Sequence, residues 1–199
     1  MSADSIEVSS PDGATSGGAW HPRGGLGASL ERLRELLLAE GGLMASLVQS
    51  GSEGSVPQTQ SLGPAQLAAS GPRAGGHGPD YELLMETIYE GYLLHYGASR
   101  VVRPREEDLG LLAGDRLYAL GLARLVALGD IEAVAELADV ITLSALARAG
   151  ATPEMAEAVW MAGAYAVGWG GSAGYENAKA LLRIGSPEAL EALHRLVPA

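Results

Sequence analysis

Two aspartates lie inside apolar helical sequence, and they have the clearest potential for chemistry in this chain. Asp115 and Asp139 each have Leu and Ala as near neighbours. A buried carboxylate needs a partner, because an unpaired buried charge costs several kcal/mol. Acid–base catalysis and metal binding are possible roles, but a structural ion pair is the expected one. Arg116, Arg124 and Arg148 are the possible partners.

The other chemistry-bearing residues form no constellation that predicts catalysis. The four histidines, His21, His77, His95 and His194, are isolated from one another, so no zinc site is expected. His77 lies among Gly and Pro and is expected to be solvated. His95 falls near a helix C-terminus, where the helix dipole favours a protonated ring.

A glycine-rich stretch from Ala166 to Gly174 is superficially similar to a phosphate-binding loop. It lacks the Gly-Lys-Ser/Thr ending and follows no strand, so we expect a hinge between helices. Ser172 within it has no nucleophile elbow and no recognisable histidine partner.

The amino-acid composition excludes or disfavours several classes of function. The 199 residues include no Cys and no Phe, which excludes disulfides and thiolate chemistry. The net charge of −11 and the absence of a basic cluster argue against nucleic-acid binding. No apolar run is long enough to span a membrane and no signal peptide is recognised, so a cytoplasmic protein is expected.

Residues 1–79 are expected to form a largely disordered arm, because they contain 15 Gly, 12 Ser and 6 Pro. One short amphipathic helix is predicted at 29–39, with Ser29 as its cap and a stripe of Leu30, Leu33 and Leu37. We expect this helix to pack on its own domain, with partner binding as the alternative. Residues 50–79 are interpreted as a linker with one weak helical turn near Gly63.

Residues 80–199 are predicted to form an all-α bundle of about six helices. Asp80 is the expected cap of the first helix, which Gly97 ends. Its polar face, at Glu82, Glu86 and Glu90, is assigned to solvent. The opposite face is assigned to the core, and its expected buried residues are Leu84, Ile88 and Tyr92. Tyr89, Tyr92 and Tyr96 form a stripe expected at the core or at an interface.

The second helix of the bundle is predicted between Pro104, in its first turn, and Gly129. Gly110, Gly114 and Gly121 lie near one stripe of this helix. Glycine costs up to about 1 kcal/mol relative to alanine inside a helix, so this pattern predicts close passage of another helix. Further helices are predicted at 131–148, from Thr152, at 172–184 and at 188–196.

The segment Leu111-Leu-Ala-Gly-Asp-Arg-Leu-Tyr-Ala-Leu-Gly-Leu-Ala-Arg-Leu125 resembles the trans-polyprenyl diphosphate synthase superfamily. In that family a mid-chain helix carries Leu-Ala-Gly-Asp, here Leu112 to Asp115. The resemblance covers about residues 80–145 and implies a truncated isoprenoid-synthase-like bundle. It also implies an aspartate-rich motif on the preceding helix, but that helix ends Gly91-Tyr-Leu-Leu-His95-Tyr-Gly.

The family's second aspartate-rich motif is absent too, and these aspartates hold magnesium on the diphosphate. The chain is therefore similar to non-catalytic small subunits, such as component 1 of heptaprenyl diphosphate synthases. The resemblance implies a catalytic partner subunit that carries any magnesium and diphosphate, with no cofactor on this chain. The candidate structural or interface residues are Gly110, Gly114, Asp115, Gly121, Tyr92, His95 and Tyr96.

Two other readings stay open. The chain could be a stand-alone helical scaffold or regulatory interaction module, monomeric or homodimeric and unrelated to isoprenoids. It could also be an enzyme that uses Asp115 or Asp139 in a buried pocket.

Overall fold

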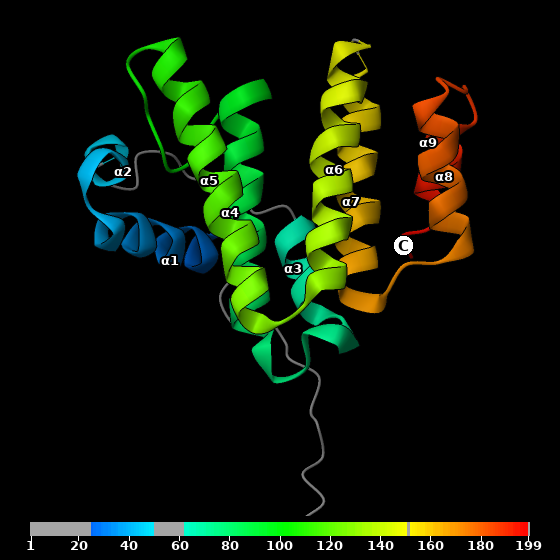
Figure 1. Cartoon of the computed structure of the whole chain (residues 1–199), viewed down its shortest axis with the longest axis horizontal. Coiled ribbons are helices and arrows are strands. Elements are labelled where there is room, and N and C mark those ends of the chain that lie inside the picture. The colour runs from blue at the N-terminus through cyan, green and yellow to red at the C-terminus, as the bar shows by residue number, and fades with distance from the viewer. Residues whose placement is uncertain (1–24, 50–61, 151, 199) are drawn as a thin grey trace, which may run out of the picture.

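The structure is a computed structural model that describes residues 25–49, 62–150 and 152–198. Within these residues the chain is all-α, as predicted, with nine α-helices and one short 3₁₀ helix, η1 (Figure 1). No helix in the described part of the chain is long and apolar enough to cross a membrane. The elements are α1 (Gly25–Glu40), α2 (Gly42–Leu47), α3 (Pro64–Ser70), η1 (Pro72–His77), α4 (Gly78–Tyr96), α5 (Glu107–Leu128), α6 (Ile131–Ala149), α7 (Pro153–Trp169), α8 (Ala173–Arg183) and α9 (Ala189–His194).

Two helix pairs form the centre of the fold. Helix α4 packs against α5, and α6 packs against α7, with α3 between α4 and α7 (Figure 1). Helices α1 and α2 lie on the outer side of the first pair, and α8 and α9 on the outer side of the second. A single antiparallel bridge between Val48 and Val102 joins the end of α2 to the α4–α5 connector.

Glycine allows α4 and α5 to approach closely, as the sequence predicts for two of the three glycines on α5. A Cβ on Gly114 would lie 3.0 Å from the carbonyl oxygen of Gly91, and one on Gly121 would lie 3.1 Å from that of Leu84. Gly110 is different, because its nearest neighbour is the Pro104 side chain. The close packing therefore depends on Gly91, Gly114 and Gly121.

Helix α3 corrects the expected linker over residues 50–79. Residues 62–77 form α3, η1 and their flanks, and the helix is buried along its length. Gly71 and Gly168 meet so closely that a Cβ on Gly71 would lie 2.2 Å from the Gly168 carbonyl oxygen. The other parts of the expected arm, 1–24 and 50–61, lie outside the described residues.

Several predicted helix ends are confirmed. The carboxylate of Asp130 accepts from the Ala133 amide at 3.0 Å, and the Ser172 hydroxyl accepts from the Tyr175 amide at 3.1 Å. Gly129 ends α5 in a left-handed conformation, with φ of 78°. Thr152 precedes Pro153 at the first position of α7, as expected.

Three predicted helix starts are wrong. Helix α1 begins at Gly25, so Ser29 lies inside it and its hydroxyl donates back to the Leu26 carbonyl. Helix α4 begins at Gly78, which places Asp80 in its first turn instead of at its cap. Pro104 precedes α5, whose N-cap is Glu106.

Two apolar clusters divide the core. The larger one joins α3, α4, α6, α7, α8 and α9 and contains Trp160 at its centre. The smaller one lies between α1, α2 and α5, and the predicted Leu30, Leu33 and Leu37 stripe belongs to it. The short helix at the expected position 29–39 thus packs on its own domain, as predicted.

We predict that Gly168→Ala lowers the free energy of unfolding by at least about 2 kcal/mol, because a Cβ there would lie 2.6 Å from the Ala68 carbonyl oxygen. The matched control is Gly27→Ala, a helical position with open space around it, which should gain up to about 1 kcal/mol. Urea unfolding of both variants measures the difference. Equal effects would refute the proposed close contact.

Candidate functional site

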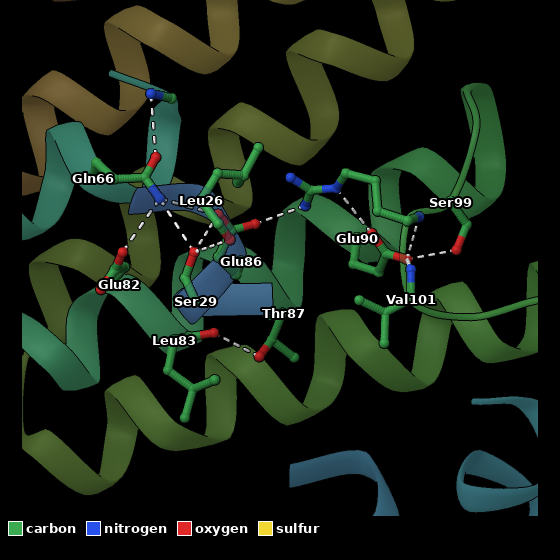
Figure 2. Close-up of polar contacts among 12 residues, drawn as sticks. Leu26, Ser29, Gln66, Glu82, Leu83, Glu86, Thr87, Glu90, Ser99 and Val101 are labelled. Atoms are coloured by element: carbon green, nitrogen blue, oxygen red, sulfur yellow. Dashed lines mark hydrogen bonds and ion pairs between the residues drawn. The ribbon is translucent and has the colours of Figure 1, made fainter. Parts of the chain in front are cut away.

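The glutamates of α4 are the largest departure from the sequence prediction. Glu82, Glu86 and Glu90 are 3%, 1% and 0% exposed, although their spacing predicts a solvent face. Helices α1 and α3 and the α4–α5 connector cover this face, and each supplies hydrogen-bond donors to it (Figure 2). We call these glutamates and their polar partners the glutamate network. Its partners are Ser29, Arg32, Gln66, Ser99 and Arg100.

Glu90 fixes the connector between α4 and α5. One of its oxygens accepts from the backbone amides of Arg100, Val101 and Val102, at 2.7, 2.6 and 3.2 Å. The Ser99 hydroxyl reaches the same oxygen at 2.5 Å. The other oxygen accepts from Nε of Arg100 at 3.2 Å. A carboxylate that only accepts hydrogen bonds suits this ring of donors.

Arg100 joins Glu90 to Glu86. Its terminal nitrogen lies 2.6 Å from one oxygen of Glu86, and its guanidinium lies 5.1 Å from the ring centre of Tyr89. Burial opposes the charge on Arg100, but the two carboxylates outweigh it and raise its pKa. Burial also raises the pKa of Glu86, and Arg100 opposes that rise only in part.

Glu82 and Gln66 complete the network towards α1 and α3. Arg32 of α1 forms an ion pair with Glu82. The Gln66 amide nitrogen contacts the other oxygen of Glu82 at 3.2 Å, and the Gly63 amide donates to the Gln66 carbonyl at 3.2 Å. This second contact defines which end of the Gln66 side chain is oxygen.

The glutamate network is suited to holding segments together. Within the described residues, no group of three or more His, Cys, Asp or Glu side chains is placed to hold a metal ion. Every carboxyl oxygen of the three glutamates lies within hydrogen-bonding distance of a polar group of this chain. We therefore assign the network a structural role that links α1, α3, α4 and the connector.

The sequence does not predict this network, because its partners come from three other segments. Ser29 is predicted as a helix cap, Gln66 lies in the expected linker, and Arg100 lies between two predicted helices. The available signal was three glutamates on one helix face, followed after ten residues by an arginine.

Most of the candidate interface residues lie around the α4–α5 contact. The His95 ring stacks on Tyr118 with centroids 5.4 Å apart, and its Nε2 lies 3.2 Å from an oxygen of Asp115. Asp115 is 70% exposed, so the expectation of a buried carboxylate is wrong there. Tyr92 is buried and accepts a hydrogen bond from Nε of Arg148 at 2.7 Å, whereas Tyr96 is half-exposed.

Asp139 forms the structural ion pair that the sequence predicts, but with other partners than those expected. Lys179 and Arg183 of α8 each lie 2.8 Å from one of its oxygens. Lys179, the chain's only lysine, is buried and also contacts Glu136 and Glu176. Partial burial opposes ionisation of Asp139, but the hydrogen bonds from α8 outweigh it and lower its pKa.

Helices α5 and α6 each carry an exposed apolar stripe. On α6 the stripe comprises Ile131, Ala135, Ala138, Thr142 and Leu146, which helical spacing places on one face. On α5 it comprises Leu112, Ala119, Ala123 and Val126, with the exposed charged residues Asp115 and Arg116 between Leu112 and Ala119. Leu112 and Ile131 are 57% and 62% exposed. Helices α5 and α6 lie on the same side of α4 and α7 (Figure 1), and the residues of both stripes are exposed. We call these residues the α5–α6 face.

The surface also has two hollows, and the first of them adjoins the α5–α6 face at Leu112. One of about 460 Å³ lies between the α1–α2 turn and α5, where Leu43 and Leu112 line it and the Arg116–Glu40 ion pair borders it. The other, of about 370 Å³, lies between α7 and α9 and includes His194. The glycine-rich stretch at 166–174 ends α7 and begins α8, so it connects two helices as expected.

Comparison with protein-family models, with curated proteins and with solved structures finds no match to this chain.

We predict that Glu90→Gln lowers the free energy of unfolding by about 3 to 5 kcal/mol, because it removes the charge that pairs with Arg100 and places an amide nitrogen against either Nε of Arg100 or the backbone amides, all of which are donors. The control is Glu31→Gln at an exposed ion pair of α1, which should change stability by less than about 1 kcal/mol. Chemical denaturation of both variants checks the prediction. A similar small loss in each would contradict it.

The Asp139 ion pair predicts a loss of stability in acid. A carboxyl whose pKa is lowered by folding stabilises the fold above its unfolded pKa, and this stability disappears as pH falls through the folded pKa. The stability difference between the wild type and Asp139→Asn should therefore be largest near neutral pH and vanish in acid. Thermal unfolding across this pH range measures it. The exposed Asp108→Asn is the control, and a pH-independent difference would argue against the ion pair.

Proposed function

We propose that this chain is a non-catalytic accessory subunit that binds a catalytic polyprenyl diphosphate synthase through its α5–α6 face. The observation that carries the proposal is an uncovered apolar face on the same helix that bears Leu112-Ala-Gly-Asp115. Exposed apolar residues at regular spacing on two neighbouring helices favour burial against another protein.

The surroundings of Leu112-Ala-Gly-Asp115 support a packing role for this motif. Ala113 and Gly114 face inward, and Gly114 lies against the backbone of α4. Leu112 and Asp115 face outward. The helix before it ends in His95 instead of paired aspartates, so this chain does not supply the carboxylates that would bind magnesium and a diphosphate.

Charge favours a different protein over a second copy as the partner. The chain carries a net charge of −11. The acidic residues beside the α6 stripe, Glu132, Glu136 and Asp139, are paired with Arg73, Lys179 and Arg183, so the charge argument rests on the net charge of the chain. Two copies of so acidic a chain would repel each other, whereas a partner with a basic surface would be attracted. A regulatory module for a partner outside isoprenoid synthesis would use the same face, and this is the second candidate.

The test is co-expression with a catalytic polyprenyl diphosphate synthase, followed by purification of the complex and analysis of product chain length. We expect a stable complex and a changed product length. Ala138→Arg should reduce complex formation at least tenfold, because it places a charge in the apolar stripe. The matched control is Ala180→Arg, on an exposed position of α8, which should leave binding unchanged.

Three outcomes distinguish the readings. If no synthase binds and the chain stays monomeric, the proposed function is refuted. A homodimer that Ala138→Arg dissociates would identify the face as self-associating. If a complex forms but product length is unchanged, the chain is an interaction module without influence on the synthase.

A further inference from the structure

The glutamate network contains one more acidic group than its two arginines balance. Arg32 pairs with Glu82, and Arg100 contacts both Glu90 and Glu86. If all three carboxyls were ionised, the buried network would carry one excess negative charge. Such a charge is costly when it is held away from water. One retained proton would make the network neutral.

The hydrogen bonds around Ser29 show where this proton fits. The Ser29 hydroxyl lies 3.0 Å from the Leu26 carbonyl and 3.3 Å from one oxygen of Glu86, but it has a single hydrogen to donate. The Gln66 amide nitrogen contacts Ser29, Glu82 and that same Glu86 oxygen, at 3.2, 3.2 and 3.4 Å, with two hydrogens. Five contacts thus share three hydrogens from Ser29 and Gln66.

A hydrogen on Glu86 reduces this shortage to one contact, the 3.4 Å approach of Gln66 to Glu86. The protonated oxygen would donate to Ser29, which is then free to donate to Leu26 and to accept from Gln66. The other oxygen of Glu86, 2.6 Å from Arg100, needs no hydrogen, since a neutral carboxyl accepts there as well. Glu90 differs, because backbone N–H groups contact one of its oxygens and Nε of Arg100 contacts the other, and these groups can only donate. The Ser99 hydroxyl, which lies 2.5 Å from both Glu90 and the Val102 carbonyl, is the one neighbour of Glu90 that could also accept.

We propose that Glu86 remains protonated in the folded chain near neutral pH, and that its proton forms a pH-sensitive latch between α4 and α1. The latch acts through Ser29, which α1 carries against α4. When Glu86 loses its proton at higher pH, the contact keeps an uncompensated negative charge and has one fewer hydrogen-bond donor. Helix α1 then separates more readily from α4.

The groups that face Glu86 favour this assignment. Ser29 and Arg32 come from α1, and Gln66 comes from α3. Glu82, Tyr89 and Glu90 lie on α4 itself, and Arg100 lies on the connector. Burial raises the pKa of Glu86 in the folded chain. The folded state then binds more protons than the state with α1 released, so docking weakens as pH rises from the ordinary glutamate pKa to the raised one.

The most direct test replaces the Glu86 carboxyl by an amide, whose N–H donor does not depend on pH. Glu86→Gln keeps a carbonyl towards Arg100 and an N–H donor towards Ser29, so its folding equilibrium constant near neutral pH should equal or exceed that of the wild type. Between the two pKa values, the wild type should lose up to tenfold in this constant per pH unit relative to Glu86→Gln. Denaturation at a series of pH values measures this loss of stability. Hydrogen exchange of α1, residues 25–40, shows whether the loss occurs at this helix.

Glu90→Gln is the matched control, because the amide nitrogen that it introduces would face donors on either side, Nε of Arg100 or three backbone amides. It should be destabilised at every pH. Infrared spectroscopy adds a direct readout in the wild type: a carboxylic acid band near neutral pH that Glu86→Gln lacks. The proposal is overturned if that band is absent, or if Glu86→Gln is destabilised as strongly as Glu90→Gln.

Discussion

The fold depends on the burial of three carboxyl groups along one face of α4. Such burial is tolerated only when each oxygen has a hydrogen-bond partner, and here the partners come from α1, α3 and the connector. Each of these segments is consequently held where its donors are needed. Glu90 contributes most to this arrangement, since one side chain organises the backbone of residues 99–102.

Close backbone contact is the second constraint, and it compensates for a chain without phenylalanine. Gly91 and Gly114 let α4 and α5 meet, and Gly71 and Gly168 do the same for α3 and α7. Small residues bring many atoms into contact at short range, so dispersion forces replace the bulk of large aromatic side chains. Trp160 supplies the aromatic volume at the centre of the larger cluster, next to Tyr89 and Tyr92.

These two constraints leave different parts of the molecule for different roles. The glutamate face of α4 is covered by other segments of the same chain. This arrangement suits a structural role that includes one titratable group. The α5–α6 face has no such partner within the described residues, and its apolar residues lie in regular order at the surface. A function through binding therefore agrees better with this distribution of polar and apolar groups than a function through a buried catalytic site.

The sequence by itself determined the class of fold and most helix ends, because capping and glycine signals act locally, as at Asp130 and Gly129. It also determined the core side of α4, where Leu84 and Ile88 are buried as predicted. Only the tertiary structure decided that Glu82, Glu86 and Glu90 are buried. Helical periodicity indicates which polar residues share a face, but it does not indicate what covers that face. The same holds for Asp139, whose partners Lys179 and Arg183 are about forty residues away in the chain. The pairing of charges that are far apart in the chain depends on how the helices pack, and local sequence patterns do not predict that packing.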